Sequence, residues 1–438
     1  MRSSRTLFLA GLLAAACRAG PPAPPGLPAP AAPELPAPAG APSDTTCRVA
    51  AGPAAKRDTV EIALADPVDP AHAPLPRNDA ERLVFSHLYE TLIRVDCAGR
   101  VLPGLAQSWE ASGDRWTFTL RDDARFWDGA PVTARDVLAS WRARDSTFAQ
   151  GATVLSDRVI GVRPPAAPFQ PLADPALAVT KRAPGGGWPI GTGGHWVSET
   201  DAAGFLSAVP VRRGTLPVLR VTTVPAGRTR DALDEGSDLV ITGDPTVLEY
   251  AGTRPGYADI PLDWSRTYVL LAPGRADGFA DIRRESLRDA VHLDARPAEW
   301  AGGRFWLADL QACAFPMTRD SGLASPRRQR VVYDQTDRNA ADLGARLVGL
   351  GVLGNRAVAT GLAPGAFAAA LRAGGDAAYV LPIRRRVFDV CRAALELPPW
   401  SWTGTIEPLL DVRLHAVVRR GLAPLLVDWS GTPRFTMR

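Results

Sequence analysis

The chain has 438 residues, of which 46% are hydrophobic, so it is long enough to bury substantial cores in two domains. Its 50 basic and 46 acidic residues leave a net charge of +4, and only Lys56 and Lys181 among the basic residues are lysine. The short basic runs are interleaved with acids and indicate solvated surface, which argues against nucleic acid as a partner.

A targeting signal is predicted at the start of the chain. Arg2 and Arg5 precede an apolar run over residues 7–16, and Cys17 follows. The run is only about ten residues, too short for a helix across a bilayer of roughly 30 Å. We therefore predict a signal peptide over residues 1–16. Its end, Leu-Ala-Ala-Ala-Cys, resembles a lipobox, which implies that Cys17 is lipidated and anchors the protein to a membrane.

The next segment is a predicted tether. Residues 18–56 are mostly proline, alanine and glycine, with almost no bulky side chain to bury. Such a composition favours an extended, semi-rigid spacer, so we assign residues 17–56 to a lipidated cysteine and a tether. A proline-rich recognition motif is the alternative.

Folded structure is predicted to begin at residue 59. Residues 59–65 alternate apolar and polar side chains as a strand does, and they run into the loop Asp66-Pro-Val-Asp-Pro70. Residues 78–91 carry apolar side chains at i, i+4 and i+8, which predicts an amphipathic helix lying on a sheet. Residues 116–121 alternate again and predict a half-buried strand.

A second helix is predicted to start near residue 133. Asp128-Gly129 is typical of a turn, and Thr133 is followed three residues later by Asp136. This spacing is close to a capping box, in which the hydroxyl and the carboxylate accept hydrogen bonds from unpaired backbone amides. An apolar run that ends at Trp141 completes the helix signal.

Residues 89–141 resemble a known family through an ordered set of short matches. The set comprises Tyr89-Glu-Thr-Leu92, Leu102-Pro-Gly-Leu-Ala106, Ser108-Trp-Glu110, Thr117-Phe-Thr-Leu-Arg121, Phe126, Asp128-Gly129, Pro131, Thr133-Ala134, Asp136-Val137 and Ser140-Trp141. In this order they resemble the signature region of the family 5 extracellular solute-binding proteins, the peptide and nickel receptors of ABC importers. Taken one at a time, the aromatic residues indicate packed core positions.

Later segments extend the resemblance more loosely. Residues 191–196, Gly-Thr-Gly-Gly-His-Trp, resemble the family's glycine-rich strand entry, where glycine permits positive φ and close backbone approach. Residues 230–244 resemble its helix, glycine and strand step, and residues 268–271 resemble the strand that leaves the first lobe. The asparagine that usually ends this strand is replaced by Ala272-Pro273.

A β-α-β-α-β pattern is predicted for the second lobe. Strands are expected over residues 329–333, 356–360 and 376–381, with helices over residues 338–350 and 364–373. Helices between short apolar strands imply parallel crossovers, and ligands then bind at the carboxyl ends of the strands. The last helix and strand, joined by Gly-Gly-Asp-Ala, also match the family.

The resemblance implies an α/β fold with two lobes, the type II periplasmic-binding-protein fold with hinge crossings. We place the crossings near Arg266 and Arg392. Residues 57–266 together with 393–438 are then lobe I, and residues 267–392 are lobe II.

Four cysteines remain after Cys17. They are Cys47, Cys97, Cys313 and Cys391. An even number in an exported chain indicates disulfides, and three pairings are possible. We favour Cys47 with Cys97 and Cys313 with Cys391, because each pair then lies within one lobe. No C-x-x-C spacing is present, so neither a zinc site nor a redox motif is expected.

The sequence contains no pattern typical of catalysis. H-E-x-x-H, G-x-S-x-G and G-x-x-x-x-G-K-S/T are all missing from it. The five histidines are scattered; His72 and His195, which flank the predicted cleft, are the best-placed candidates for metal ligands, whereas His87 and His292 lie on predicted helices and indicate packed or surface positions. We therefore predict no enzymatic activity, no metal and no cofactor; an exported hydrolase with a nucleophile cluster in the cleft is the alternative.

The predicted cleft has aromatic walls and a few polar groups. The candidate ligand-binding residues are Asp69, Pro70, Tyr89, Trp188, Trp196, Tyr268 and Tyr379. For each of them a structural role is the alternative.

The sequence therefore predicts a monomeric, lipid-anchored solute receptor on the periplasmic or extracellular face of the cell envelope. It would deliver a peptide or another small solute to the permease subunits of an ABC importer. Ligand favours a closed form only if it contacts both lobes better in that form. The alternative is a degenerate receptor that acts as a surface interaction or sensing lipoprotein. Two features favour it: the segment between Leu381 and Pro408 is shorter than in family relatives, and the asparagine after Leu271 is missing.

Overall fold

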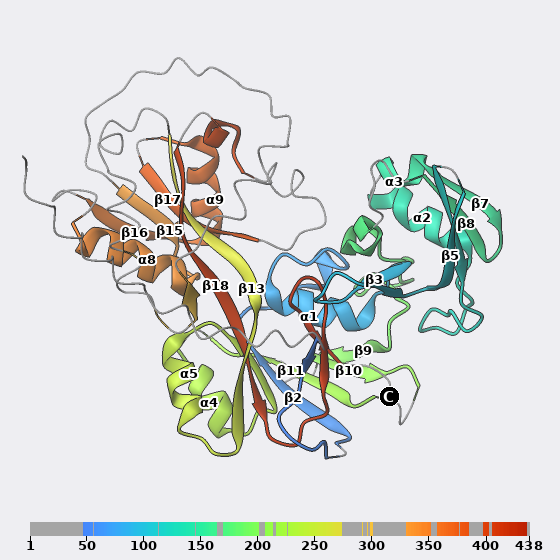
Figure 1. Ribbon diagram of the computed structural model, residues 1–438, viewed down its shortest axis with the longest axis horizontal. Helices are drawn as coiled ribbons and strands as arrows, with labels where there is room; N and C mark the ends of the chain where they lie inside the picture. The colour runs from blue at the N-terminus through green and yellow to red at the C-terminus, as the bar shows by residue number, and fades with distance from the viewer. Residues whose placement is uncertain are drawn as a thin grey trace, which may run out of the picture. The chain divides into compact units, whose positions relative to one another are not determined.

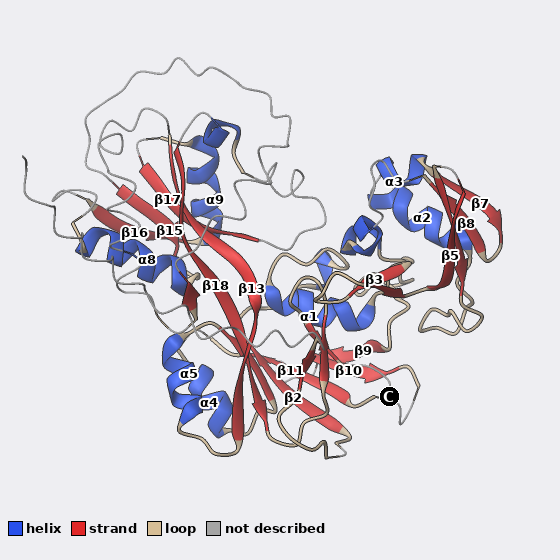
Figure 2. Cartoon of the chain, viewed as in Figure 1, coloured by secondary structure: helices blue, strands red, loops and turns tan. Residues whose placement is uncertain are grey.

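The computed structural model describes residues 47–273, with gaps at 56, 113, 145, 164–169, 201–205, 213–215 and 226, and residues 330–435, with gaps at 352–356, 376, 385–396 and 403–404 (Figures 1 and 2). Between these ranges it describes residues 291, 296 and 298–300. The predicted signal peptide, Cys17, most of the tether, Cys313 and Cys391 lie outside the described residues. Among the helices that are described, none combines the length and apolar character needed to cross a membrane.

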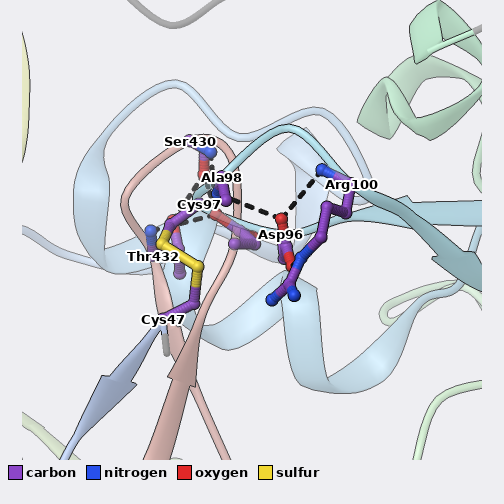
Figure 3. The surroundings of a disulfide bond; sticks show 8 residues. Cys47, Asp96, Cys97, Ala98, Arg100, Ser430 and Thr432 are labelled. Carbon is purple, nitrogen blue, oxygen red and sulfur yellow. Dashed lines mark hydrogen bonds and ion pairs between the residues drawn. A yellow bond between two sulfur atoms is a disulfide. The ribbon is translucent and has the colours of Figure 1, made fainter. Parts of the chain in front are cut away.

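The two ends of the described chain meet in one small sheet. β1 (Arg48–Val49) pairs antiparallel with β19 (Leu425–Val427), which pairs with β20 (Pro433–Arg434). Cys47, directly before β1, forms a disulfide with Cys97, and their Cα atoms are 5.5 Å apart (Figure 3). This is one of the two pairings that we favoured. It ties the N-terminal end of the described chain to the turn that follows β3 (Ile93–Val95).

Residues 93–190 form an antiparallel module with its own core. β3 pairs with β4 (Val101–Pro103), and a four-stranded sheet has the order β5 (Ala106–Ser112), β6 (Arg115–Leu120), β8 (Val159–Val162), β7 (Ala152–Ser156). The helical segments are α2 (Ala134–Arg144), α3 (Ser146–Gln150), η2 (Gln170–Ala173) and η3 (Pro175–Leu177). Trp141 is fully buried in the module core with Phe118 and Leu120, and its indole Nε1 donates a hydrogen bond to the Leu177 carbonyl at 2.9 Å.

The start of α2 confirms the predicted capping box. The Thr133 amide donates to Asp136 Oδ2 at 2.8 Å, and the Asp136 amide donates to Thr133 Oγ1 at 3.3 Å. Each side chain thus accepts a hydrogen bond from the backbone amide of the other residue, and the Asp136 amide also reaches the Thr133 carbonyl oxygen at 3.0 Å.

One long sheet runs through the rest of the chain. Its order is β16 (Val358–Leu362), β15 (Arg330–Asp334), β17 (Ala377–Arg384), β13 (Tyr257–Ala272), β18 (Thr405–Arg419), β12 (Leu239–Thr242), β2 (Thr59–Leu64), β11 (Val218–Thr223), β10 (Leu206–Pro210) and β9 (His195–Thr200). β14 (Glu299–Trp300) also pairs with β18. β13 and β18 pair along nearly their whole length and join the first half of the sheet (β12 to β9) to the second half (β16, β15 and β17) (Figure 1).

The first half of the sheet is covered on both faces. α1 (Asp79–Leu88) shares a core with Ile62 of β2. α4 (Thr229–Asp234) and α5 (Pro245–Gly252) share a different core with Ala63. Ile62 and Ala63 are neighbours in β2, so their side chains point to opposite faces. The short helix η1 (Pro70–His72) lies between β2 and α1.

The second half of the sheet confirms the predicted β-α-β-α-β unit. β15 pairs parallel with both β16 and β17. α8 (Arg338–Gly349) shares a core with Val331, whereas α9 (Pro364–Ala373) packs against the core that contains Val332, so the two helices cover opposite faces. η4 (Pro399–Trp402) precedes β18. The lobe boundaries at 266/267 and 392/393 stay predictions, and the second of them lies outside the described residues.

Candidate functional site

Aspartates follow the central strand of each sheet half. β2 lies between β11 and β12 and is parallel to both, and Asp66 comes two residues after its end. β15 lies between β16 and β17, and Asp337 comes three residues after its end. Ligands of α/β proteins bind at the carboxyl ends of such strands. These two aspartates are therefore at the positions where the topology places a binding site.

Asp79 connects the two sheet halves. It lies in the first turn of α1, and its Oδ1 is 2.9 Å from Arg384 Nη2 at the end of β17. Its Oδ2 pairs with Arg266, in the middle of β13. The side chain of Asp79 is only 25% exposed, that of Arg384 30% and that of Arg266 14%. One carboxylate thus holds two guanidinium groups in surroundings where water screens charge weakly.

We call Asp66, Asp79, Arg266, Asp337 and Arg384 the charged junction. Burial opposes ionisation of Asp79, but the charges of Arg266 and Arg384 outweigh it and hold the pKa of this carboxyl well below its usual range. Burial raises the pKa of Asp66, and the negative charge of Asp79 raises it further. Burial also raises the pKa of Asp337. The junction therefore combines a firmly ionised carboxylate with two carboxyls that accept a proton more readily than usual.

Tyr268 of β13 belongs to the same region but is used structurally. Its hydroxyl is 2.9 Å from both carboxylate oxygens of Asp337, whose Oδ1 accepts the Ala340 amide and so caps α8. Burial raises the pKa of Tyr268 well above its usual value, so the hydroxyl remains a donor. The side chain is 1% exposed. A solute could contact Tyr268 only after this region opened.

A second ion pair connects the halves on the α5 side. Asp244 follows β12 and caps α5 by accepting the Thr246 amide at 2.9 Å. Its Oδ2 accepts from Arg338 Nη1, at the start of α8, at 2.8 Å. Asp244 and Arg338 therefore link the carboxyl ends of β12 and β15 by charge.

A pocket lies beside the charged junction. Arg82 and Asp79 of α1, Ser265 of β13 and Arg384 of β17 line it, together with the turn at residues 430–433. It has a free volume of about 20 Å³, enough for about one or two water-sized groups. We call it the Arg82 pocket.

Tyr89 and Trp188, two of the predicted ligand-binding residues, come together around Phe85. The ring centroid of Phe85 is 5.9 Å from that of Tyr89 and 6.0 Å from that of Trp188, both edge to face. The Tyr89 hydroxyl donates to the Pro189 carbonyl at 3.3 Å, and Tyr89 is 5% exposed. In this structure the pair packs α1 against the segment that enters β9.

Trp196, Asp69 and Pro70 lie nearer the surface. Trp196 is 38% exposed and meets Trp127 edge to face at 6.1 Å. Asp69 is exposed and caps η1 by accepting the Ala71 amide at 2.9 Å, with Pro70 as the first residue of that helix. Their role as ligand contacts stays a prediction.

Tyr268 and Tyr379 lie on opposite faces of the long sheet. Tyr379 of β17 is paired with Leu271, so it shares a face with Leu271 and Val269 rather than with Tyr268. Tyr379 is 2% exposed, and its hydroxyl donates to the Ala370 carbonyl near the end of α9 at 2.9 Å. The two tyrosines therefore cannot line one wall together.

Gly191 and Gly193 are required by close packing, not by backbone conformation. A Cβ at Gly191 would lie 2.2 Å from the Leu88 carbonyl oxygen, and one at Gly193 would lie 2.2 Å from the His87 carbonyl oxygen. Neither glycine has a positive φ. The close approach that we expected is present, and its partner is the end of α1.

The two histidines that we weighed as metal ligands lie in different surroundings. His72 Nδ1 is 2.6 Å from Glu81 Oε1. His195 is 1% exposed, its Nε2 is 2.9 Å from the Pro217 carbonyl oxygen, and its ring meets the ring of His87 at 5.5 Å. Burial lowers the pKa of His195. Within the part of the chain that the structure describes, no group of three or more His, Cys, Asp or Glu side chains is placed to hold a metal ion.

Sequence reasoning missed most of the charged junction. It singled out Asp69 in the loop after β2, although Asp66 is the aspartate nearer to the strand end. The usable signal was the position of an aspartate between a buried strand and a helix, which Asp66, Asp244 and Asp337 share. Nothing local marks Asp79, Arg266 and Arg384 as partners, because they are up to 305 residues apart in sequence.

The comparison with protein families gives a match inside the antiparallel module. Residues 100–154 match the bacterial extracellular solute-binding proteins, family 5 Middle. This match confirms the resemblance to family 5. The matched segment begins within the signature region that we recognised in the sequence, and it extends past α3 into β7.

Two curated relatives show how far the sequence similarity extends. The periplasmic murein peptide-binding protein MppA of Escherichia coli is 44% identical over 77 residues, which are 17% of this chain and 14% of MppA. The nickel-binding periplasmic protein of Escherichia coli is 45% identical over 60 residues, which are 13% of this chain and 12% of that protein. The alignable sequence thus spans only a small part of these relatives.

Solved structures extend the likeness to most of the chain. NikZ from Campylobacter jejuni in complex with Ni(L-His) superposes with a TM-score of 0.61 at 14% identity, covering 86% of this chain and 98% of NikZ. NikA from Brucella suis in complex with Fe(III)-EDTA gives a TM-score of 0.59 at 19% identity, covering 82% of this chain and 95% of NikA. At these identities the likeness shows the fold alone. The fold is the two-lobed α/β fold of periplasmic binding proteins.

Proposed function

We propose that this protein is an extracytoplasmic solute-binding lipoprotein of an ABC importer, which takes peptides or similar small solutes and closes over them by hinge motion. The observation that carries the proposal is the charged junction, where the carboxyl ends of β2 and β15 come together. The fold supports binding at this position, since open α/β sheets bind their ligands there.

The long strands β13 and β18 support the hinge. β18 pairs with β12 in the first half, β13 pairs with β17 in the second half, and β13 and β18 pair with each other. Bending within these two strands therefore changes how the halves approach each other. The pairs Asp79 with Arg384 and Asp244 with Arg338 connect the halves directly. A solute would favour the closed form to the extent that it strengthens contacts across the same junction.

The names of the relatives support the choice of solute class. MppA is named for murein peptides, and the other curated relative for nickel. A binding protein that delivers its solute to permease subunits needs no catalytic group, and we propose no enzymatic activity. Lipidation of Cys17 would hold a monomer at the outer face of a membrane, with the tether between the anchor and the folded part.

The decisive experiment is a search for the bound solute. The full-length protein with Cys17→Ser, exported but without a lipid attachment site, would be purified and analysed by native mass spectrometry, followed by thermal unfolding with peptides, sugars and metal ions. A solute at 100 times its dissociation constant adds about 2.7 kcal/mol of stability. If no solute co-purifies and none shifts the unfolding midpoint, the proposal fails.

The anchor has its own test. Cells that express the wild-type chain or Cys17→Ser would be labelled with a radioactive fatty acid and fractionated. Wild-type protein is expected to carry label and to sediment with membranes, and Cys17→Ser is expected to lose both properties. An unlabelled wild-type protein would contradict lipidation but would leave solute binding open.

A further inference from the structure

Two arginines line the Arg82 pocket, and only one of them forms an ion pair with a carboxylate among the described residues. Arg384 pairs with Asp79 at 2.9 Å, and Asp79 also pairs with Arg266. The guanidinium of Arg82 makes no ion pair and no hydrogen bond in the part of the chain that the structure describes, and its Nε is buried. The charges of Asp79, Asp174 and Asp428 favour the Arg82 cation, but no hydrogen bond joins it to any of these carboxylates.

The surroundings of Arg82 make this charge costly. A donor that is buried without a partner loses hydration that nothing replaces, and the Nε of Arg82 is such a donor. Burial, together with the positive charge of Arg384, lowers the pKa of Arg82 to about 10. The side chain is still protonated at neutral pH, because this value is far above 7. A negatively charged hydrogen-bond acceptor is the partner that Arg82 lacks.

A second polar group in the pocket also lacks a partner. The hydroxyl Oγ of Ser265, in β13, is buried and has no hydrogen-bond partner among the described residues. Ser265 and Arg82 line the same pocket, from β13 and α1 respectively. A single oxyanion between them would accept hydrogen bonds from both. Two independent unsatisfied donors thus point to the same kind of ligand.

The lining also selects among anions. The pocket has room for about one or two water-sized groups, which matches the two oxygens of a carboxylate. A guanidinium holds a carboxylate with two parallel hydrogen bonds. Asp79 and Asp263 line the same pocket, so a dianion such as phosphate would meet two carboxylates. A monoanion meets less repulsion.

We propose that the Arg82 pocket binds the carboxylate group of a small organic anion, held by Arg82 and Arg384 with a hydrogen bond from the Ser265 hydroxyl. Arg82 belongs to α1, on the first half of the sheet, and Arg384 ends β17, in the second half. The bound carboxylate contacts both halves beside β13 and stabilises their contact. The site does not depend on the proposed transport function.

The test uses the full-length chain with acetate as the probe. Sodium acetate replaces sodium chloride at constant ionic strength while the thermal unfolding midpoint is followed. The wild-type midpoint is expected to rise in a saturable way. Arg82→Gln should bind acetate at least about tenfold more weakly, because a charged hydrogen bond is lost. Arg77→Gln is the matched control, since Arg77 is exposed, precedes α1 and does not line the pocket.

Two further measurements keep the proposal falsifiable. Ser265→Ala covers the case in which Arg82→Gln fails to fold: it should weaken acetate binding severalfold, and it should not lower the midpoint in chloride, because the hydroxyl that it removes is buried without a partner. A flat wild-type response to acetate, or equal acetate binding by Arg82→Gln and the wild type, overturns the proposal.

The source of the carboxylate is distinguished by trialanine and its C-terminal amide. If trialanine competes with acetate and the amide does not, the pocket takes the carboxylate of the solute itself. If neither peptide competes, the pocket is a separate site for small anions. Acetate binding without any peptide binding would support the pocket even if the proposed transport of peptides were wrong.

Discussion

The antiparallel module and the charged junction are stabilised by opposite kinds of contact. In the module, Phe118, Leu120 and Trp141 are completely excluded from water. At the junction, Asp79, Arg266 and Arg384 are partly exposed and held by charge. The module carries the segment that matches family 5, whereas the junction occupies the position where the fold binds ligands. The recognisable sequence of this protein is thus its scaffold, and its candidate site is elsewhere.

The module should lose the most stability from a single change. Trp141→Ala removes a fully buried indole and leaves a cavity, so we expect a loss of about 3–5 kcal/mol in the free energy of unfolding. Urea denaturation followed by tryptophan fluorescence and circular dichroism measures it. Leu155→Ala in β7 is the control, because Leu155 is 52% exposed and should change stability by less than about 0.5 kcal/mol. Similar losses for both variants would show that the module has no specific core.

A smaller loss is expected at the junction. Asp79→Asn leaves Arg266 and Arg384 without their shared carboxylate and should cost about 2 kcal/mol, less than a fully buried pair because the side chain is 25% exposed. Asp157→Asn is the control, since Asp157 makes only an exposed ion pair at 3.7 Å and should have almost no effect.

The pH dependence of Asp79→Asn identifies the cause of that loss. The pKa of Asp79 is depressed in the folded protein, so its contribution is complete above the ordinary carboxyl pKa of about 4 and is lost as the pH falls below it. The difference between wild type and Asp79→Asn should therefore shrink between pH 4 and pH 2. A difference that stays constant with pH would mean that packing, not charge, stabilises the junction.

A still smaller effect is expected at the start of α2. Thr133→Ala removes the hydroxyl that accepts the Asp136 amide, and we expect a loss of about 1 kcal/mol. Thr133→Ser keeps the hydroxyl and should retain the wild-type stability. Equal losses in the two variants would assign the effect to the methyl group of threonine rather than to the cap.

The smallest predicted effect is a gain in stability, not a loss. The pKa of Asp66 is raised in the folded protein, so ionisation of this carboxyl opposes folding once the pH rises above about 4. Asp66→Asn should therefore gain slightly in stability at pH 7 and show no gain at pH 4. A loss at pH 7 would mean that the Asp66 carboxylate makes a contact that its burial and neighbours do not indicate.

Local structure could be predicted from the sequence because its signals are local. The strand at residues 115–120, the capping box at Thr133 and the helix Pro364–Ala373 each depend on residues within a few positions of one another. The parallel pairing of the strands in the second half could also be predicted, since strand–helix alternation allows few other arrangements.

The site could not be predicted in the same way. Whether Tyr268 and Tyr379 share a face depends on the register between β13 and β17, and a shift of one residue would reverse the answer. The partners of Asp79 come from β13 and β17, so their meeting depends on how α1 and the two sheet halves are placed. Aromatic residues in the sequence indicated burial correctly, but burial is what removes Tyr268 and Tyr379 from a solute in this structure.

The crosslink between Cys47 and Cys97 has a mechanical consequence. β1 has only two residues, and by itself such a short strand would peel from β19 under a modest pull. With the crosslink, force that enters at Cys47 divides between β19 and the β3–β4 turn, so the load is shared by segments from both ends of the folded chain. Reduction would leave the whole load on β1, and unravelling would then start there.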